Sequence, residues 1–535
     1  MTLDPETGYV VDTEYTFNVY PEMFPSNLSY VCAERGYATR LSRLNEGFDY
    51  CELGCGNGVG SNLMAASHPQ GRFVAVDLNP AHIVNGRRLA EAANLGNIRF
   101  LESVFADLLT RDDLPEFDII ALHGVYSWIG ERHRAEVVSF IRDRLRPGGV
   151  VYVSYNTLPG WADSMPIRQL MVEHTAGMNV SSVERAGIAR DFLKEISGYK
   201  MGYFGEGTLP ANIVKSLDQQ SREYLAHEYL NADWHPQYSA EVAREMARAR
   251  LAYVGDATLR NNALSLLFPE PVQKFITSAP SPTAVQTRKD YLTSIRFRQD
   301  LFVKGANRVM AMGREGLYAS IRFASMKTDP IPTAIATPSR EISLEGLPRE
   351  MVARCRERPL QALDIIERFL AAGHSAATAL YYLEVLVAMA LLEPIPIDRE
   401  SYGEFPGLDV AKQRLFSIGD FNRAICAFSF SRMINATLVA PLTGARQVVS
   451  WLEAGLLLGW EQEGADGAAG WCAARILRTG NNLVSDGRAL VGQGEHVDFL
   501  NGTLGNFCDN RLPTLVKAGA ITVTEGRGQG AEGRG

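Results

Sequence analysis

The stretch Glu52-Leu53-Gly54-Cys55-Gly56-Asn57-Gly58 decides the fold of this chain. It continues an apolar run with strand character and precedes a helical pattern over residues 61–67. Glycines between a strand and a helix let the backbone turn tightly and approach a ligand closely. Asp77 ends a second predicted strand, at about the 20-residue spacing typical of an acid that binds a ribose. The stretch therefore predicts a site for an adenosine-containing cofactor.

Short β-rich runs alternate with helical patterns between residues 46 and 155. This alternation predicts an α/β fold with a doubly wound, Rossmann-like sheet, whose ligands bind at the carboxyl ends of the strands. The predicted strands are 48–53, 72–77, 98–102, 117–122 and 149–155. The predicted helices are 61–67, 80–94 and 133–145, with a short segment near 108–113.

The rest of the chain reads as mainly helical segments around this sheet. A helix and a strand near residues 242–255 are expected to complete the sheet after a helical insertion, and the proline-rich residues 329–339 predict the main linker. The predicted regions are an aromatic arm or cap over 1–45, a cofactor-binding core over 46–160, an insertion with sheet completion over 161–325, a C-terminal domain over 340–524 and a disordered tail over 525–535.

Composition excludes several classes of protein. With Lys+Arg at 53 and Asp+Glu at 61, the net charge of −8 gives no general basic footprint for nucleic acid. The N-terminus lacks the apolar core of a secretory signal, and Glu384 interrupts the most apolar run, 379–392. The seven cysteines are scattered without a CxxC pair, which suits a reducing compartment and argues against a structural zinc. We expect a cytoplasmic protein without a metal, a nucleic-acid partner or a transmembrane segment.

The spacing of the glycines discriminates between adenosine cofactors. The dinucleotide fingerprint G-x-G-x-x-G fails, because Val59 and Ser61 stand where its last glycine is required. What is present is E-x-G-x-G-x-G, opened by Glu52. A carboxylate at this place is unfavourable for a pyrophosphate and suits a ligand with a positive amino group and a sulfonium.

In this pattern the chain resembles class I S-adenosylmethionine-dependent methyltransferases over residues 48–156. The resemblance implies S-adenosylmethionine as cofactor and Asp77 as the ribose-binding acid. Val104 stands where the family usually has an acid beside the adenine, so that contact is expected from Val104, Phe105 and backbone groups, although Phe105 equally suits the core. The expected cofactor-binding residues are Glu52, Gly54, Gly56, Gly58, Asp77, Leu78, Val104, Phe105 and His123.

Three further segments sharpen the resemblance: 155–161 (YNTLPGW), 227–231 (HEYLN) and 297–305 (FRQDLFVKG). Together they are similar to bacterial methyltransferases that carry a methyltransferase regulatory domain. That group includes rickettsial protein-lysine methyltransferases that modify an outer-membrane protein. The resemblance covers roughly residues 10–310 and implies a regulatory domain within 161–325. It also implies a possible winged helix in the C-terminal region, where residues 376–394 suit either a helix with a wing or ordinary helical packing.

The residues that can reach a transferred methyl should follow the fourth and fifth strands. His123 is either a proton acceptor or a hydrogen-bonded side chain at the edge of the cofactor. Tyr126 and Trp128 either form an aromatic wall for a cation or pack in the core. Tyr155 and Asn156 are expected to point into the same cleft. These five residues are the predicted catalytic set.

The methyl acceptor follows only from the resemblance, which implies a lysine side chain of a protein substrate. A small-molecule methyltransferase and a non-catalytic regulator that binds S-adenosylmethionine remain alternatives. The Asn/Asp-Pro-Pro-Tyr motif of amide and adenine methylation is absent from the sequence, which lowers the odds for those acceptors. A homodimer is expected only from its frequency among oligomers.

Overall fold

The computed structural model describes residues 18–231, 233–305, 307–309, 313–325, 329–395, 415–439, 446–485, 487–517 and 520–524. The predicted tail, 525–535, and the first 17 residues of the predicted arm lie outside the described residues. Within these ranges, no helix has both the length and the apolar content to cross a membrane.

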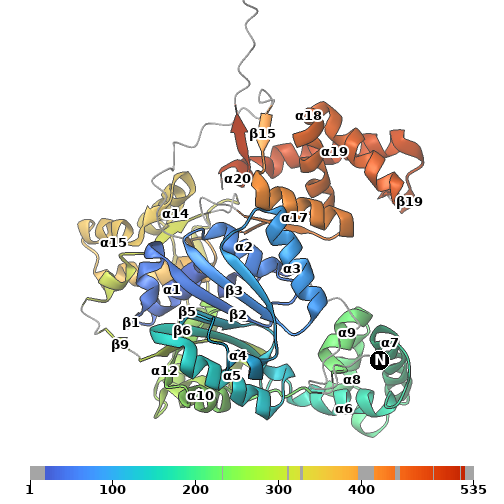
Figure 1. The fold of residues 1–535 in the computed structure, drawn as a ribbon. Coiled ribbons are helices and arrows are strands. Elements are labelled where there is room, and N and C mark those ends of the chain that lie inside the picture. Colours follow the sequence, from blue (N-terminus) through green and yellow to red (C-terminus); the bar gives the residue numbers. More distant parts are fainter. Residues whose placement is uncertain are drawn as a thin grey trace, which may run out of the picture.

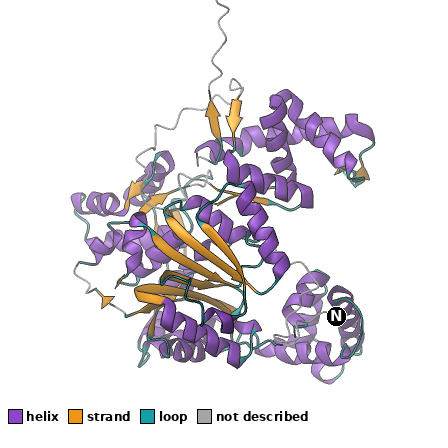
Figure 2. Cartoon of the chain, viewed as in Figure 1, coloured by secondary structure: helices purple, strands orange, loops and turns teal. Residues whose placement is uncertain are grey.

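The fold is built on a seven-stranded mixed sheet with the order β4-β3-β2-β5-β6-β8-β7, and the arrows in Figure 2 trace its strands. The first five strands in this order are parallel, and β8 is antiparallel to both of its neighbours. The strands are β2 (Phe48–Leu53), β3 (Gly71–Asp77), β4 (Ile98–Glu102), β5 (Phe117–Leu122), β6 (Leu145–Asn156), β7 (Leu251–Asp256) and β8 (Phe297–Lys304).

Helices cover both faces of this sheet (Figure 1). Tyr50 of β2 belongs to a core formed with α1, α2 and α3, whereas its neighbour Cys51 belongs to a core formed with α4, α5 and α10. Successive strand residues point to opposite faces, so β2 buries side chains on both of its faces. The helices are α1 (Pro25–Glu34), α2 (Val59–Ser67), α3 (Pro80–Ala92), α4 (Phe105–Leu108), α5 (Glu131–Arg144) and α10 (Ser239–Ala247). The predicted doubly wound α/β fold is confirmed.

Two predicted boundaries differ from the structure. Strand β6 begins at Leu145, ahead of the predicted start, because Leu145 already pairs with Phe117 before the register shifts. The left-handed Gly148, at φ +77°, lies inside that irregular pairing. The short helix expected near residues 108–113 is α4, at Phe105–Leu108, and Thr110 closes a turn by donating its hydroxyl to the carbonyl of Asp107.

Residues 157–231 leave the sheet and form a helical lobe, drawn in green in Figure 1. Its helices are α6 (Met165–His174), α7 (Ser182–Gly198), α8 (Leu209–Leu217) and α9 (Arg222–Tyr229). Their apolar side chains form a core of their own, which also includes Trp128 from the loop after β5. The chain then returns through α10 to β7, and α11 (Leu264–Leu267), α12 (Glu270–Thr277) and α13 (Pro282–Thr293) precede β8.

The region beyond residue 313 forms two groups of elements. The first has a core around Phe323 and Leu386 and comprises α14 (Leu347–Glu357), α15 (Ala362–Ala371), α16 (Ala376–Ala388), the sheet of β10 (Arg322–Ala324), β13 (Leu360–Gln361) and β14 (Glu393–Ile395), and the hairpin of β11 (Ala334–Ala336) and β12 (Glu341–Ser343). The stretch predicted as the main linker, 329–339, therefore carries one strand of a hairpin. Helix α16 is followed by a strand as expected for a winged helix, but the wing stays a prediction because 396–414 lie outside the described residues.

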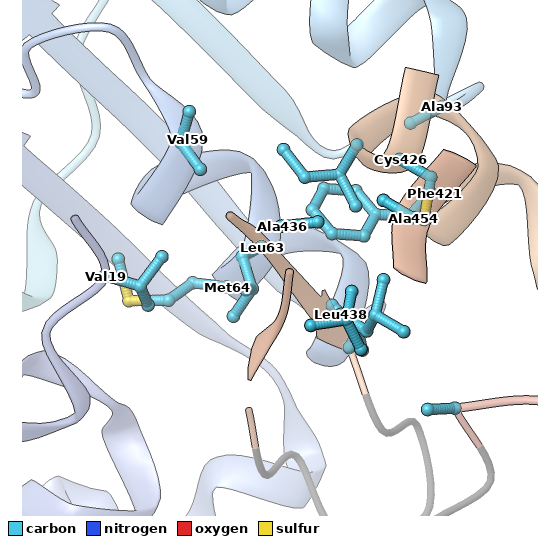
Figure 3. Close-up of a cluster of buried hydrophobic side chains, with 14 of the residues drawn as sticks. Val19, Val59, Leu63, Met64, Ala93, Phe421, Cys426, Ala436, Leu438 and Ala454 are labelled. Atoms are coloured by element: carbon cyan, nitrogen blue, oxygen red, sulfur yellow. The ribbon is translucent and has the colours of Figure 1, made fainter. Parts of the chain in front are cut away.

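The second group packs on the sheet domain itself. It comprises α17 (Gly419–Arg432), α18 (Trp451–Arg478), α19 (Gly492–Asn510), α20 (Leu512–Lys517) and the hairpins of β15 (Leu415–Ser417) with β20 (Thr522–Thr524), β16 (Ala436–Val439) with β17 (Arg446–Val449), and β18 (Val484–Ser485) with β19 (Arg488–Ala489). Figure 3 shows Phe421 and Leu438 of this group beside Leu63 and Met64 of α2. The two-residue strands β1 (Tyr37–Ala38) and β9 (Asn307–Arg308) pair with each other.

Candidate active site

The glycine stretch forms the turn between β2 and α2. Gly54, Gly56 and Gly58 all have positive φ, at +79°, +53° and +71°, a region that favours glycine over other residues. A Cβ on Gly54 would lie 2.3 Å from Cγ2 of Val125, so this turn is closed to side chains. At Gly58 the same atom would meet Phe100 at 2.6 Å and Gly86 at 2.9 Å. Gly58 is therefore needed for close packing against α3 and β4, whereas Gly54 and Gly56 border the larger of two cavities.

Asp77 holds this turn in place from the end of β3. Its Oδ2 accepts a hydrogen bond of 2.8 Å from the backbone N–H of Gly56, and its Oδ1 accepts one of 2.9 Å from the N–H of Asn79. Nδ1 of His82 lies 3.1 Å from the same Oδ1. The carboxylate is thus oriented from three sides, at the carboxyl edge of the sheet where a ligand of this fold binds.

Glu52 is the second acid of the turn, and it is buried. Burial raises the pKa of Glu52 from its ordinary 4.5 to about 7; the hydroxyl of Ser61, which donates to Oε2, opposes this shift, and the nearby charge of Asp77 adds to it. A cationic ligand group beside Glu52 would offset the cost of its ionised form. The binding of a cation beside Glu52 would therefore favour loss of its proton.

A cavity of about 340 Å³ lies at the carboxyl ends of β2, β3 and β5. Eight of the predicted site residues line it: Gly54, Gly56, Asp77, Leu78, Val104, Phe105, His123 and Trp128. A smaller cavity of about 40 Å³ shares Gly54, Gly56 and His123 with it, and it is also lined by Glu52, Gly58 and residues of the segment 18–24. The described part of the predicted N-terminal cap therefore lies against the glycine turn.

His123 lies between the two cavities. Its Nδ1 is 2.7 Å from the hydroxyl of Tyr152, and its ring stacks on that of Tyr20 with centroids 3.5 Å apart. Burial lowers the pKa of His123 from 6.5 to about 3. The imidazole is therefore neutral at physiological pH, and it is a weak base.

The structure does not bring all of the predicted catalytic residues to the cavity. Tyr126 is fully buried and donates its hydroxyl to Glu245 of α10. Tyr155 is 1% exposed and donates to Oδ2 of Asp300 at 2.5 Å. Both therefore belong to the core on the α5 and α10 side of the sheet. The expectation that Tyr155 points into the cleft is corrected by the parity of β6, because alternate residues face opposite sides.

Asn156 and Trp128 mark the boundary between the sheet and the helical lobe. The backbone N–H of Asn156 donates a 2.8 Å hydrogen bond to Oγ of Ser127, next to Trp128. Trp128 lines the large cavity and also packs with Trp234, at a centroid distance of 6.4 Å. The side chain of Asn156 faces the carboxyl of Glu228 from α9. The helical lobe is thus connected to the cavity wall.

Several residues of the large cavity were not predicted. They include Asn79, His82, Ser103, Val125, Ile129, Arg132, His133 and Glu136. In the first turns of α5, Glu136 pairs with Arg132 at 3.1 Å and with His133 at 2.9 Å. The i,i+3 and i,i+4 spacing of these polar residues was readable in the sequence, but their position over the cavity depends on how α5 packs. Tyr20, which lines the smaller cavity, was also not among the predicted site residues, although it belongs to the aromatic segment that was predicted as an arm or cap.

The comparisons with known proteins agree with this geometry. Residues 51–151 match a family model described as "Methyltransferase domain", and residues 221–304 match one described as "Predicted methyltransferase regulatory domain". The chain is a class I S-adenosylmethionine-dependent methyltransferase with a regulatory domain, and its cofactor is S-adenosylmethionine. The site fits that cofactor in three respects: the glycine turn at Gly54 and Gly56, the acids Glu52 and Asp77 near the ends of β2 and β3, and the size of the cavity.

A relative of nearly the same length identifies the family more narrowly. The uncharacterized protein sll1526 of Synechocystis is 32% identical over 514 residues, which cover 96% of this chain and 99% of the relative. The chain belongs to the family of that protein. The uncharacterized protein RP789 of Rickettsia prowazekii is 28% identical over 258 residues, or 47% of this chain and 45% of RP789. Among solved structures, PKMT2 from Rickettsia typhi, in complex with AdoHcy, has a TM-score of 0.68 at 18% identity and covers 95% of this chain and 99% of its own.

Proposed function

We propose that this methyltransferase transfers its methyl group to lysine side chains of a protein substrate. The observation that carries the proposal is the likeness in fold to the rickettsial PKMT2 over 95% of the chain, which includes the helical lobe and the C-terminal region. The sequence motifs of the rickettsial protein-lysine methyltransferases, at 155–161, 227–231 and 297–305, point the same way.

In this proposal, Asp77 binds the ribose, Glu52 attracts the amino-acid end of the cofactor, and Val104 and Phe105 line the adenine. S-adenosylmethionine supplies, when bound, a methyl on a positively charged sulfur that leaves as a neutral thioether. Gly54 and Gly56 let the backbone approach that ligand. The chain itself must align the acceptor with the methyl, and such positioning can supply roughly 7–11 kcal/mol of the barrier.

An acceptor lysine must also be deprotonated, since its ordinary pKa is about 10.4. His123 does not suit the role of the base, because its pKa of about 3 makes it too weak to hold the proton of an amine. We assign it instead to positioning: its ring, fixed by Tyr20 and Tyr152, closes the wall between the two cavities. Trp128 contributes an aromatic surface to the same wall.

The domain boundaries follow as part of the proposal. Residues 46–160 form the cofactor-binding core, 161–325 the insertion and regulatory domain, and 340–524 the C-terminal region that engages the substrate or a partner. A cytoplasmic location and a homodimer belong to the same working hypothesis.

The test is to incubate the protein with radiolabelled S-adenosylmethionine and a lysate of cells that lack its gene. The proposal expects label in protein bands, and methylated lysine after acid hydrolysis. Label confined to small molecules would replace the proposed substrate with a metabolite. Absence of label in every fraction, with intact cofactor binding, would favour the regulator that binds S-adenosylmethionine without turnover.

A further inference from the structure

One face of helix α5 lines the large cavity. Ile129 directly precedes the helix, Arg132, His133 and Glu136 follow in its first two turns, and all four side chains line the cavity. Their spacing of i, i+3, i+4 and i+7 places them on one side of a helix. Glu131 lies in the first turn as well, but it is exposed and does not line the cavity. The geometry of α5 therefore selects Glu136 as the glutamate of this helix that faces the cavity.

The start of α4 lines the same cavity. Val104 and Phe105 follow the carboxyl end of β4, and α4 packs against α5 (Figure 1). Leu108 of α4 and Val137 of α5 belong to one apolar core, which holds the two helices together. The part of the cavity beside Val104 and Phe105, where we place the adenine in the proposed function, is therefore bordered by α5.

This part of the cavity offers few acids to a ligand. Among the described residues that line the cavity, only Asp77 and Glu136 carry a carboxylate. Asp77 is held at the glycine turn by the N–H groups of Gly56 and Asn79, at the end where the ribose is expected. The side chain of Val104 cannot accept a hydrogen bond. Glu136 is therefore the acid that remains for the adenine end of the cavity.

The carboxylate of Glu136 is held in place and keeps free acceptor sites. Its Oε1 lies 3.1 Å from Nε of Arg132, and its Oε2 lies 2.9 Å from Nδ1 of His133. A carboxylate has about four lone-pair sites, so each oxygen can accept a further hydrogen bond. The Arg132 side chain is 82% exposed, whereas that of Glu136 is 14% exposed, so solvent screens the arginine and weakens this ion pair. Glu136 can therefore bind a donor inside the cavity without losing either neighbour.

We propose that Glu136 contacts the cofactor and accepts a hydrogen bond from the exocyclic amino group of its adenine. An amino group that enters a largely apolar cavity without an acceptor costs free energy, and a carboxylate is a strong acceptor. Val104 stands where related methyltransferases usually have an acid beside the adenine, and Glu136 supplies that carboxylate from α5 instead. This inference rests on the proposed function only in placing the adenine beside Val104 and Phe105.

The test compares S-adenosylhomocysteine with an analogue that carries a hydrogen in place of the exocyclic amino group and is otherwise identical. Calorimetry measures the affinity of the full-length protein for each ligand. The wild-type protein should bind S-adenosylhomocysteine at least tenfold more tightly, because a site built to accept a hydrogen bond rejects a ligand that lacks the donor. In Glu136→Ala this preference should fall below threefold, with the affinity for the analogue nearly unchanged.

Two further variants accompany Glu136→Ala. Glu136→Gln conserves the shape of the side chain and a weaker, uncharged acceptor, so its preference should lie between those of the wild type and Glu136→Ala. Glu131→Ala removes the exposed glutamate of the same helix and should retain the full preference. Equal affinity of the wild-type protein for the two ligands would overturn the proposal. An equal loss of affinity for both ligands in Glu136→Ala would overturn it as well, because that result describes a merely structural role.

The binding measurement requires no methyl acceptor. Label on a small molecule in the lysate assay would refute the lysine substrate and leave the role of Glu136 intact. Conversely, a preference that does not depend on Glu136 would refute this role and leave the lysine substrate untouched.

Discussion

The ring of Tyr20 stacks on the imidazole of His123, with centroids 3.5 Å apart and 21° between the planes. This contact joins the segment before α1 to the loop after β5, and both residues line the smaller cavity beside the glycine turn. It explains the burial of His123, and with it the low pKa of that histidine.

Removing this ring should therefore open the site. In Tyr20→Ala we expect the Kd for S-adenosylmethionine to rise about tenfold, which corresponds to about 1.4 kcal/mol. The pKa of His123 should rise from about 3 toward 6.5 as water reaches the imidazole. Calorimetry and NMR titration of the histidine measure the two effects. Tyr20→Phe keeps the stacked ring and should leave both values nearly unchanged; an equal loss in both variants would argue against the stack.

The glycine turn should tolerate no side chain. Gly56 has φ +53° and borders both cavities, so Gly56→Val should abolish measurable binding of S-adenosylmethionine. Gly502 offers the matched control, since it lies exposed in α19, away from both cavities, with no atom within 4 Å of a built Cβ. Gly502→Ala should keep full affinity and gain up to about 1 kcal/mol of stability. Unchanged affinity in Gly56→Val would remove the turn from the cofactor site.

The ionised form of the buried Glu52 carboxyl should lower the stability of the fold. Its pKa is raised from 4.5 to about 7, so the folded state holds a proton that the unfolded state releases between these pH values. The free energy of unfolding therefore falls as pH rises through this window, and the cost is fully present above pH 7. Glu52→Gln should be more stable than the wild type by about 1–3 kcal/mol at pH 8 and little changed at pH 4.

The same variant should bind S-adenosylmethionine at least tenfold more weakly at pH 8, because it lacks the negative charge that we propose attracts the amino group of the cofactor. Urea unfolding at the two pH values measures the stability, and calorimetry measures the affinity. A stability difference that did not depend on pH would show that Glu52 is not the titrating group.

The pair formed by Arg298 and Asp300 should be essential to the sheet. The Arg298 guanidinium is fully buried between Asp290 and Asp300, and it lies 2.8 Å from Oδ1 of Asp300. Arg298→Leu leaves two buried carboxylates without their cation, which should cost about 3–5 kcal/mol in unfolding free energy. Lys274→Ala, which removes an exposed ion pair with Glu270, should cost less than about 1 kcal/mol. Comparable losses in the two variants would contradict this account.

The sequence predicted correctly those features that depend on residues close together along the chain. The strands of the core and the helices between them follow from the periodicity of apolar residues, and the class of cofactor follows from the spacing from Glu52 to Gly58. The short helix near residue 108 was displaced because four residues carry too little periodicity to fix its start. Residues 340–524, which hold most of both groups, were predicted as one domain, since the packing of α17 against the sheet domain leaves no pattern in either segment.

The direction of single side chains was the least predictable feature of the site. Tyr155 and Asn156 are neighbours at the end of β6, and from the sequence both side chains were predicted to point into the cleft. The pleat of the strand separates them: Tyr155 joins Asp300 in the core, whereas Asn156 faces Glu228. A shift of β6 by one residue would exchange the faces to which these two side chains point. Only the hydrogen-bond register of β6 with β8 fixes which residue lies on which face.

The sequence by itself determined that this chain has a Rossmann-like sheet and a site for S-adenosylmethionine, because the backbone conformation of a glycine turn and the acid at the next strand end are local properties. The tertiary structure decided what surrounds that site. Tyr20 and His123 come from distant segments, and they meet at the edge where the parallel strands end because the segment 18–24 packs against the glycine turn. Long-range packing, which no local pattern encodes, connects the helical lobe to the cavity through Trp128, which belongs to the core of the lobe and also lines the cavity.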